Sequence, residues 1–70
     1  MTKLKEIRTN QNITQKKLAE ISGVNIRMIQ KYETGERDLN KAEVVTVYRL
    51  AKALDVPIED LLTIKELEDK

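Results

Sequence analysis

Residues 20–35 read EISGVNIRMIQKYETG, and this stretch decides the fold. An amphipathic helix ends at Ser22-Gly23, and a second helix begins directly after Asn25. Glycine readily adopts the positive φ that ends a helix, and asparagine is a preferred N-cap residue. The pattern therefore predicts two short helices held at a fixed angle rather than one continuous helix.

The residues around this corner divide into a packed side and an exposed side. Thr14 stands at the N-cap position of the first helix, and Ile21 is expected on its buried side. Further residues predicted to pack are Leu18, Ala19, Gly23, Val24, Ile29 and Tyr32. Arg27 and Lys31 lie one turn apart on the opposite side of the second helix, so we expect both in solvent. Two outward cations on a protruding helix suit the major groove of DNA.

Two further helices flank this pair. Leu4 and Ile7 mark one over about residues 2–10. The other is predicted from a single apolar stripe at helical spacing, made of Val44, Val47, Tyr48, Ala51 and Leu54. Together with the central pair, they make four predicted helices.

A fifth helix is predicted to open with Pro57 as its first residue, with Leu61 and Leu62 pointing inward. Residues 63–70 either extend this helix or fray. We therefore expect an all-α fold, in which residues 1–70 form a single compact domain of five helices.

The residue types that are missing exclude several classes of site. The chain has no Cys and no His, so disulfide scaffolds, thiolate metal sites and catalysis centred on either residue are excluded. No Ser, Lys or Asp lies in a recognisable activating arrangement. We expect no enzyme activity, no metal, no cofactor and no small-molecule ligand.

Charge is distributed unevenly along the chain. Residues 1–37 carry eight Lys/Arg against four Glu, whereas residues 38–70 carry five against eight acidic residues. One basic face would suit an anionic partner, although ordinary surface charge gives the same count. No apolar stretch is long enough for a signal peptide or a membrane span, so we expect a cytoplasmic protein without membrane contact.

Two stretches resemble a known family. TQKKLAEISGVNIRMIQKYETG (residues 14–35) resembles the helix-turn-helix of the phage repressor and Cro (Xre-like) DNA-binding domains. RLAKALDVPIEDLL (residues 49–62) resembles the end of the same five-helix, lambda-repressor-like domain. The resemblance covers about residues 3–62. It implies a sequence-specific transcriptional regulator that binds double-stranded DNA, most often a repressor. Because a single module this small offers limited contact area, we expect it to bind a palindromic operator as a homodimer.

The resemblance also implies roles for individual residues. Ile26, Arg27 and Lys31 would contact bases. The DNA backbone would be contacted by Gln15, Asn25, Thr34 and Arg37, with Lys41 as an alternative to Arg37. Arg8 and Glu33 match a structural ion pair of the family.

Simpler interpretations stay open for these residues. Ile26 lies near the boundary of the packed side and could be core. Arg27 and Lys31 could form a solvated face, and Gln15 could be an ordinary surface amide. Met28 is expected to pack rather than contact DNA.

The chain also departs from the family pattern in three places. The loop over residues 36–43 is longer, which leaves Arg37 and Lys41 without a firm alignment. Asp55 stands where the family usually has a capping glycine, and Pro57 replaces a polar cap. None of these changes threatens the expected fold.

Other partners stay open as well. The same scaffold could be a protein-interaction module or an antitoxin-type protein, and a protein antagonist is a further candidate partner. Ile64 and Leu67 in the acidic tail could belong to a dimer seam, although such tails are usually only solvated.

Overall fold

The computed structural model describes residues 2–62 and contains four α-helices and two 3₁₀ turns in that range. The elements are α1 (Lys3–Asn10), α2 (Gln15–Ser22), α3 (Ile26–Thr34), η1 (Leu39–Lys41), α4 (Val44–Leu54) and η2 (Ile58–Asp60). No strand occurs among these residues, so the predicted all-α fold is confirmed. None of their helices is both long and apolar enough to cross a bilayer.

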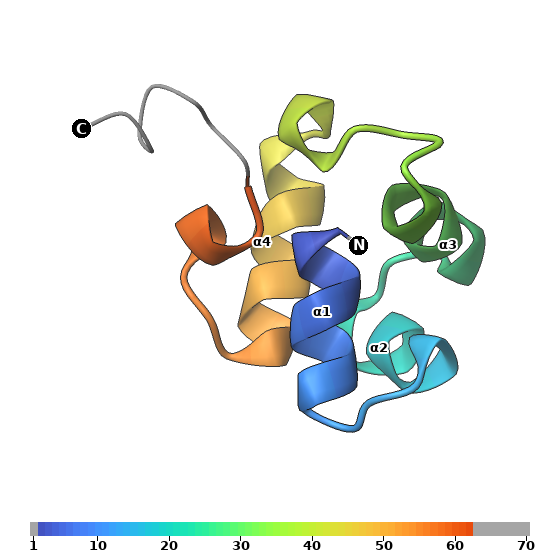
Figure 1. Cartoon of the computed structure of the whole chain (residues 1–70). Coiled ribbons are helices and arrows are strands. Elements are labelled where there is room, and N and C mark those ends of the chain that lie inside the picture. Colours follow the sequence, from blue (N-terminus) through green and yellow to red (C-terminus); the bar gives the residue numbers. More distant parts are fainter. Residues whose placement is uncertain (1, 63–70) are drawn as a thin grey trace.

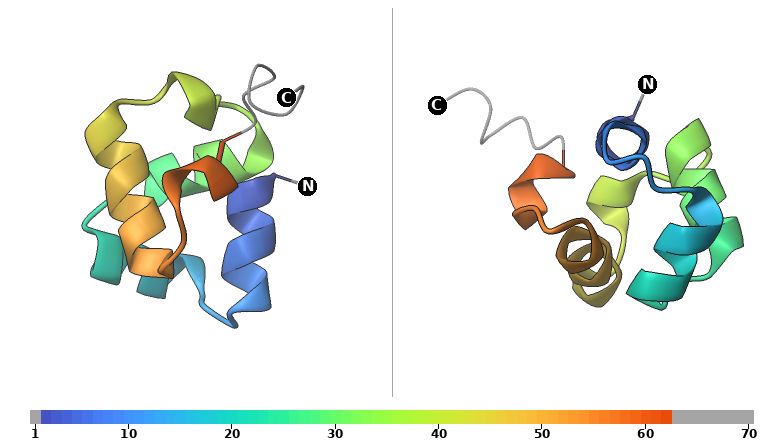
Figure 2. Two further views of the ribbon diagram at one scale, coloured as in Figure 1. Left: turned by 90° about the vertical axis from the view of Figure 1, so that its left-hand side faces the viewer. Right: turned by 90° about the horizontal axis from the view of Figure 1, so that it is seen from below.

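The helices pack around α2, which contacts both α3 and α4. α1 packs against α3, and η2 packs against α4. α1 and α4 run in roughly the same direction, and both are seen nearly end-on from below (Figures 1 and 2). The α2–α3 corner therefore packs against both of the other helices, with α2 on α4 and α3 on α1.

Side-chain caps explain where α2 and α3 begin. Thr14 Oγ1 accepts a hydrogen bond from the Lys17 backbone N–H at 3.0 Å. Asn25 Oδ1 accepts one from the Arg27 backbone N–H at 2.8 Å. Each cap satisfies one of the backbone donors that a helix leaves open at its start. Both helices therefore begin where the sequence predicts.

The core draws apolar side chains from all four α-helices. Its buried members are Leu4, Leu18, Val24, Ile29, Tyr32, Leu39, Val47, Leu50, Ala51, Leu54 and Leu61. Burying one such Leu or Ile side chain contributes about 1.5–3 kcal/mol. Leu18 of α2 and Ile29 of α3 are both completely buried, so this core fixes the two helices of the corner together.

The predicted stripe on α4 is wrong at two of its five positions. Val44 is 76% exposed and Tyr48 50% exposed, and Leu50 lies fully buried instead. Residues 47, 50, 51 and 54 share a face at spacings of three and four, and that face meets the core. Val44 and Tyr48 belong to a neighbouring exposed face, on which the Lys52 ammonium lies over the Tyr48 ring, 5.8 Å from its centroid. Ile21 of α2, also expected inside, is 45% exposed.

The fifth helix is a second correction. Pro57 has ψ of 152°, outside the helical range, and only the 3₁₀ turn η2 follows it. The turn is closed by hydrogen bonds from Asp60 N–H to Pro57 O and from Leu61 N–H to Ile58 O. Four α-helices, not five, occur in residues 2–62, because this segment forms i→i+3 bonds only.

The expectations for residues 55–62 can be compared with the structure, whereas those for residues 63–70 cannot. Leu61 is buried as predicted, and Leu62 packs partly against the core. Asp55 ends α4 with φ of 56°, as the position of the missing glycine implies. The proposed helix extension and the Ile64–Leu67 seam lie outside the described residues.

Candidate nucleic-acid interface

The corner between α2 and α3 depends on one glycine conformation. Gly23 has φ of 74°, and its N–H donates to Ala19 O at 3.0 Å to end α2. A Cβ added at Gly23 would meet no atom within 4 Å, so backbone conformation rather than space requires glycine here. Val24 is buried directly after it, and its N–H donates to Ser22 Oγ. The chain therefore changes direction within three residues and starts α3 at once.

α3 has a buried side and a polar exposed side. Ile29 and Tyr32 face the core. On the other side, Arg27, Gln30, Lys31 and Thr34 are exposed and, with Glu36, line a shallow hollow of about 330 Å³. Spacings of three and four place these α3 residues along one line of the helix. We call these four side chains the α3 polar stripe.

Gln30 is the member of this stripe that the sequence analysis missed. Its position follows from helical period alone, because it lies three residues after Arg27 and four before Thr34. Charge does not distinguish Gln30 in the sequence, because its amide is neutral. Glutamine can nevertheless both donate to and accept from a base edge.

Ile26 lies at the edge of the packed side, half-buried rather than core or fully exposed. Together with Lys16, Glu20 and Asn25 it borders a second shallow hollow between α2 and the start of α3. Its methyl groups therefore remain partly accessible beside Arg27. Ile26 is therefore not simply a core residue, which was the alternative interpretation.

A buried ion pair lies behind α3. Arg8 donates to the two carboxylate oxygens of Glu33, through Nε at 2.6 Å and through Nη2 at 3.0 Å. Its third nitrogen, Nη1, donates to Ile13 O at 2.7 Å. The side chains are only 11% and 2% exposed, respectively. This two-point geometry joins α1 to the last turn of α3 and fixes the orientation of α3.

Gln15 connects this ion pair to the α3 polar stripe. Its Nε2 donates to Glu33 Oε1 at 3.0 Å, and its Oε1 accepts from Gln30 Nε2 at 3.5 Å. Gln15 is half-buried and is therefore not an ordinary surface amide, which was the alternative to a phosphate contact. The sequence could not reveal this link, because its three residues come from different turns of two helices.

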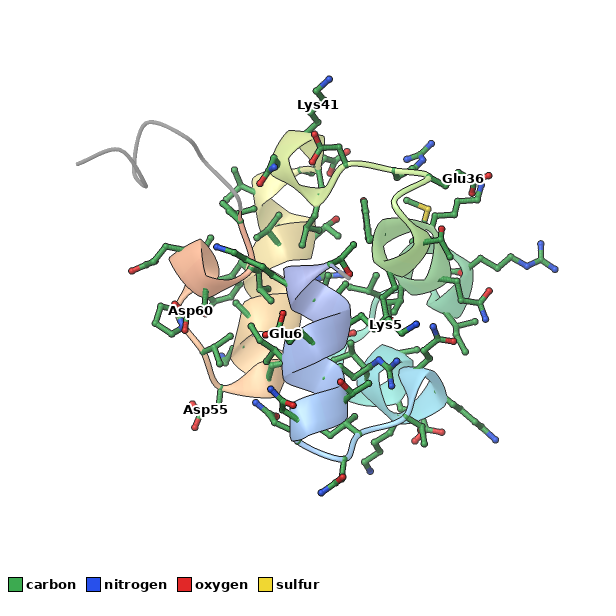
Figure 3. The ribbon with its side chains drawn as sticks, in the orientation of Figure 1. Lys5, Glu6, Glu36, Lys41, Asp55 and Asp60 are labelled. Carbon is green, nitrogen blue, oxygen red and sulfur yellow. The ribbon has the colours of Figure 1, made fainter. Side chains whose placement is uncertain are left out.

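The candidate phosphate contacts after α3 do not gather in one place. The Thr34 hydroxyl donates to Lys31 O and accepts from the Glu36 N–H, which orders the end of the helix. Arg37 N–H donates to Lys31 O, but the Arg37 side chain lines a separate groove beside α1. Lys41 extends from η1 away from α3, whereas Glu36 lies near the end of α3 (Figure 3). Thr34 is therefore the best placed of the three.

The described residues offer no cluster of three or more acidic, His or Cys side chains that could hold a metal ion. The polar chemistry of the interface is instead that of guanidinium, ammonium, amide and hydroxyl groups. These are the groups that proteins use on phosphates and on base edges.

Comparison with known proteins agrees with this geometry. The helix-turn-helix family model HTH_3 matches residues 4–61. No curated protein and no solved structure matches the chain significantly. The family consists of DNA-binding regulators that are generally not enzymes. The match covers α1 to η2 and includes the corner whose geometry is described above. The chain therefore belongs to the Xre/Cro-like helix-turn-helix family of proteins that bind double-stranded DNA.

Proposed function

We propose that the protein is a sequence-specific transcriptional repressor that inserts α3 into the major groove of its operator. The observation that carries this proposal is the α3 polar stripe, an exposed line of hydrogen-bonding side chains on a helix anchored from behind by a buried ion pair. A rigid helix aligns such groups with base edges before binding, which lowers the entropy lost in the complex.

The base contacts follow from the chemistry of each side chain. Arg27 and Lys31 donate to guanine O6 and N7, and Ile26 packs against a thymine methyl group. Gln30 presents its amide to adenine N6 and N7. Because the Gln30 amide is also hydrogen-bonded to Gln15, its donor and acceptor are oriented before DNA arrives.

The backbone contacts flank this reading surface. Gln15 uses one amide hydrogen on Glu33 and offers the second to a phosphate. Thr34 and the N-terminal region of α3 at Asn25 contact phosphates on either side, and Arg37 adds a long-range positive charge. These contacts set the register of α3 without reading sequence.

A single copy offers little contact area. α3 has nine residues and is about 13 Å long, which covers only a few base pairs. A homodimer on a palindromic operator, with half-sites about 10 base pairs apart, would double the contacts. Repression then follows from occupying DNA that the transcription machinery needs.

Selection of bound sequences from a random double-stranded pool tests the proposal. We expect a short palindromic motif whose affinity falls steeply with added salt, with a log–log slope of about −0.9 per phosphate contacted. Recovery of no enriched sequence, with a salt slope near zero, would show that the protein is not a sequence-specific DNA-binding protein.

A further inference from the structure

Three side chains behind and within the α3 polar stripe are joined by hydrogen bonds that all run in one direction. Gln30 Nε2 donates to Gln15 Oε1 at 3.5 Å, and Gln15 Nε2 donates to Glu33 Oε1 at 3.0 Å. Gln30 and Glu33 lie three residues apart on α3, so one amide from α2 reaches both. We call this series the Gln30–Gln15–Glu33 link.

The direction of the link is fixed at its buried end. Glu33 is buried, and each of its oxygens already accepts from Arg8, at 2.6 Å from Nε and at 3.0 Å from Nη2. A carboxylate paired with a guanidinium can only accept, so the Gln15 atom that faces it must be the nitrogen. Turning the Gln15 amide over would place its oxygen against a carboxylate oxygen in a largely buried site, which is unfavourable.

The orientation of the Gln15 amide in turn determines that of Gln30. Because the Gln15 nitrogen faces Glu33, its oxygen faces Gln30, and only a donor of Gln30 can meet that oxygen. One N–H of Gln30 is therefore used within the protein. Its second N–H and its carbonyl oxygen remain available on the exposed side of α3.

One acceptor and one donor match adenine but not guanine. In the major groove adenine offers the N6 amino group as a donor and N7 as an acceptor, whereas guanine offers two acceptors, O6 and N7. Against guanine, the available oxygen of Gln30 would face another acceptor, and its single available N–H could satisfy only one atom. The opposite orientation of Gln30 would present both N–H groups and would suit guanine instead.

We propose that Glu33, acting through Gln15, makes Gln30 select adenine over guanine in the operator. Glu33 and Gln15 are positioning residues in this inference, and Gln30 is the residue that contacts the base. The inference rests on the proposed function, because it concerns one base that α3 reads. It goes further by assigning the choice between two purines to a carboxylate that lies buried behind the helix.

The test compares affinities for two DNA duplexes that differ only at the base pair read by Gln30. Selection from a random pool supplies the operator, and Gln30→Ala identifies the base pair, because preference should relax there. We expect adenine at that position. Binding of the full chain is then measured on this duplex and on one with guanine in its place, with far-UV circular dichroism to verify folding. The ratio of the two affinities cancels sequence-independent contributions, including changes of net charge.

Gln15→Lys reverses the outer step of the link and leaves the Arg8–Glu33 ion pair in place. An ammonium group can only donate, so it can donate both to Glu33 and to the Gln30 oxygen, which turns the Gln30 amide over. The preference should shift from adenine toward guanine by about tenfold. The control is Gln15→Lys in the Gln30→Ala background, where the same added charge should leave the ratio unchanged.

Deletion of the Gln15 amide is a weaker test than its reversal. Gln15→Ala frees Gln30 without turning it over, and an unrestrained glutamine still pairs well with adenine. The ratio should fall only about twofold, and most of the lost affinity should be shared by all sequences because a phosphate contact is lost as well.

Glu33→Gln tests the origin of the direction. An amide at this position can donate to Gln15 as well as accept from it, so the orientation of Gln30 that suits guanine becomes accessible and the ratio should fall about threefold or more. Arg8→Lys is the matched control, because it weakens the same ion pair but leaves the carboxylate, and it should not change the ratio. If Glu33→Gln does not fold, Gln15→Lys decides the question by itself.

The outcomes separate this inference from the proposed function. Guanine at the Gln30 position of the selected operator overturns the inference, and so does a ratio that Gln15→Lys leaves unchanged. If the protein selects an operator but Gln30→Ala relaxes no base pair, the inference fails and the proposed function stands. If no sequence is enriched at all, the proposed function fails and the inference falls with it.

Discussion

The exposed sides of α3 and α4 differ in chemistry and in what stands behind them. The exposed side of α3 is polar, and behind it lie the Arg8–Glu33 ion pair and the linked amide of Gln15. The exposed side of α4 carries Val44, Val45 and Tyr48 beside Arg49 and Lys52, and behind it lies an aliphatic core. Polar groups discriminate between partners through directed hydrogen bonds, whereas apolar groups gain from any well-shaped dry contact. One small domain thus presents two exposed sides that suit different kinds of contact.

Glu33→Ala should give the largest effect, because it removes the anchor behind α3. The change leaves Arg8 buried without its partner, and we expect the free energy of unfolding to fall by about 3–5 kcal/mol. Thermal and urea unfolding would measure it.

A double-mutant cycle isolates the coupling between the two charges. Once Arg8→Ala is present, the further change Glu33→Ala should cost much less than it does alone. Near-zero coupling would mean that α3 is held by its apolar contacts and not by the ion pair.

Arg27→Ala tests the reading surface itself. Affinity for the selected operator should fall by about 1–3 kcal/mol, with relaxed preference at one base pair, while thermal stability is unchanged. Gln15→Ala should instead weaken all sequences more evenly, because the contact that we propose for Gln15 is with a phosphate. Equal losses on all sequences for both variants would remove Arg27 from the base-reading group.

Alanine substitution on the two sides of α4 compares its core side with its exposed side. Val47→Ala deletes methyl groups from a buried position and should destabilise the monomer by about 1–2 kcal/mol. Val44→Ala removes an exposed β-branched residue and should leave the monomer as stable or slightly more so. Urea unfolding at low protein concentration makes the comparison, and equal losses would place Val44 in the monomer core.

Glu36→Gln should give the smallest effect. Glu36 shares the hollow with the α3 polar stripe, so its carboxylate lies beside the surface that we propose to face DNA. Neutralising it should raise affinity for all sequences by about twofold at low salt and less at high salt. A loss of preference at one base pair would instead identify Glu36 as a base contact, since carboxylates accept from cytosine N4.

The parts of the fold that depend on local signals could be predicted. Thr14 and Asn25 cap the helices that they precede, and Gly23 adopts the positive φ that the break requires. Asp55 adopts the same conformation although it is not glycine. These features involve neighbours within a few residues, and the sequence records such neighbours directly.

The α4 face and the last helix could not be predicted in the same way. Val44 and Leu50 are both apolar and both fit helical spacing, so periodicity alone could not choose which of them packs inside. Pro57 is compatible with the start of a helix and equally with the extended residue before a 3₁₀ turn. Contacts with distant segments decided both cases.

By itself, the sequence determined that two short capped helices meet at a glycine and that cations lie on the outer side of the second. Tertiary structure alone decided that Gln15 joins Glu33 to Gln30, and that Tyr48 and Ile21 remain exposed. The reason is physical. Caps and turns are set by energies between residues close in sequence, whereas burial and side-chain hydrogen bonds depend on which helices come together in space.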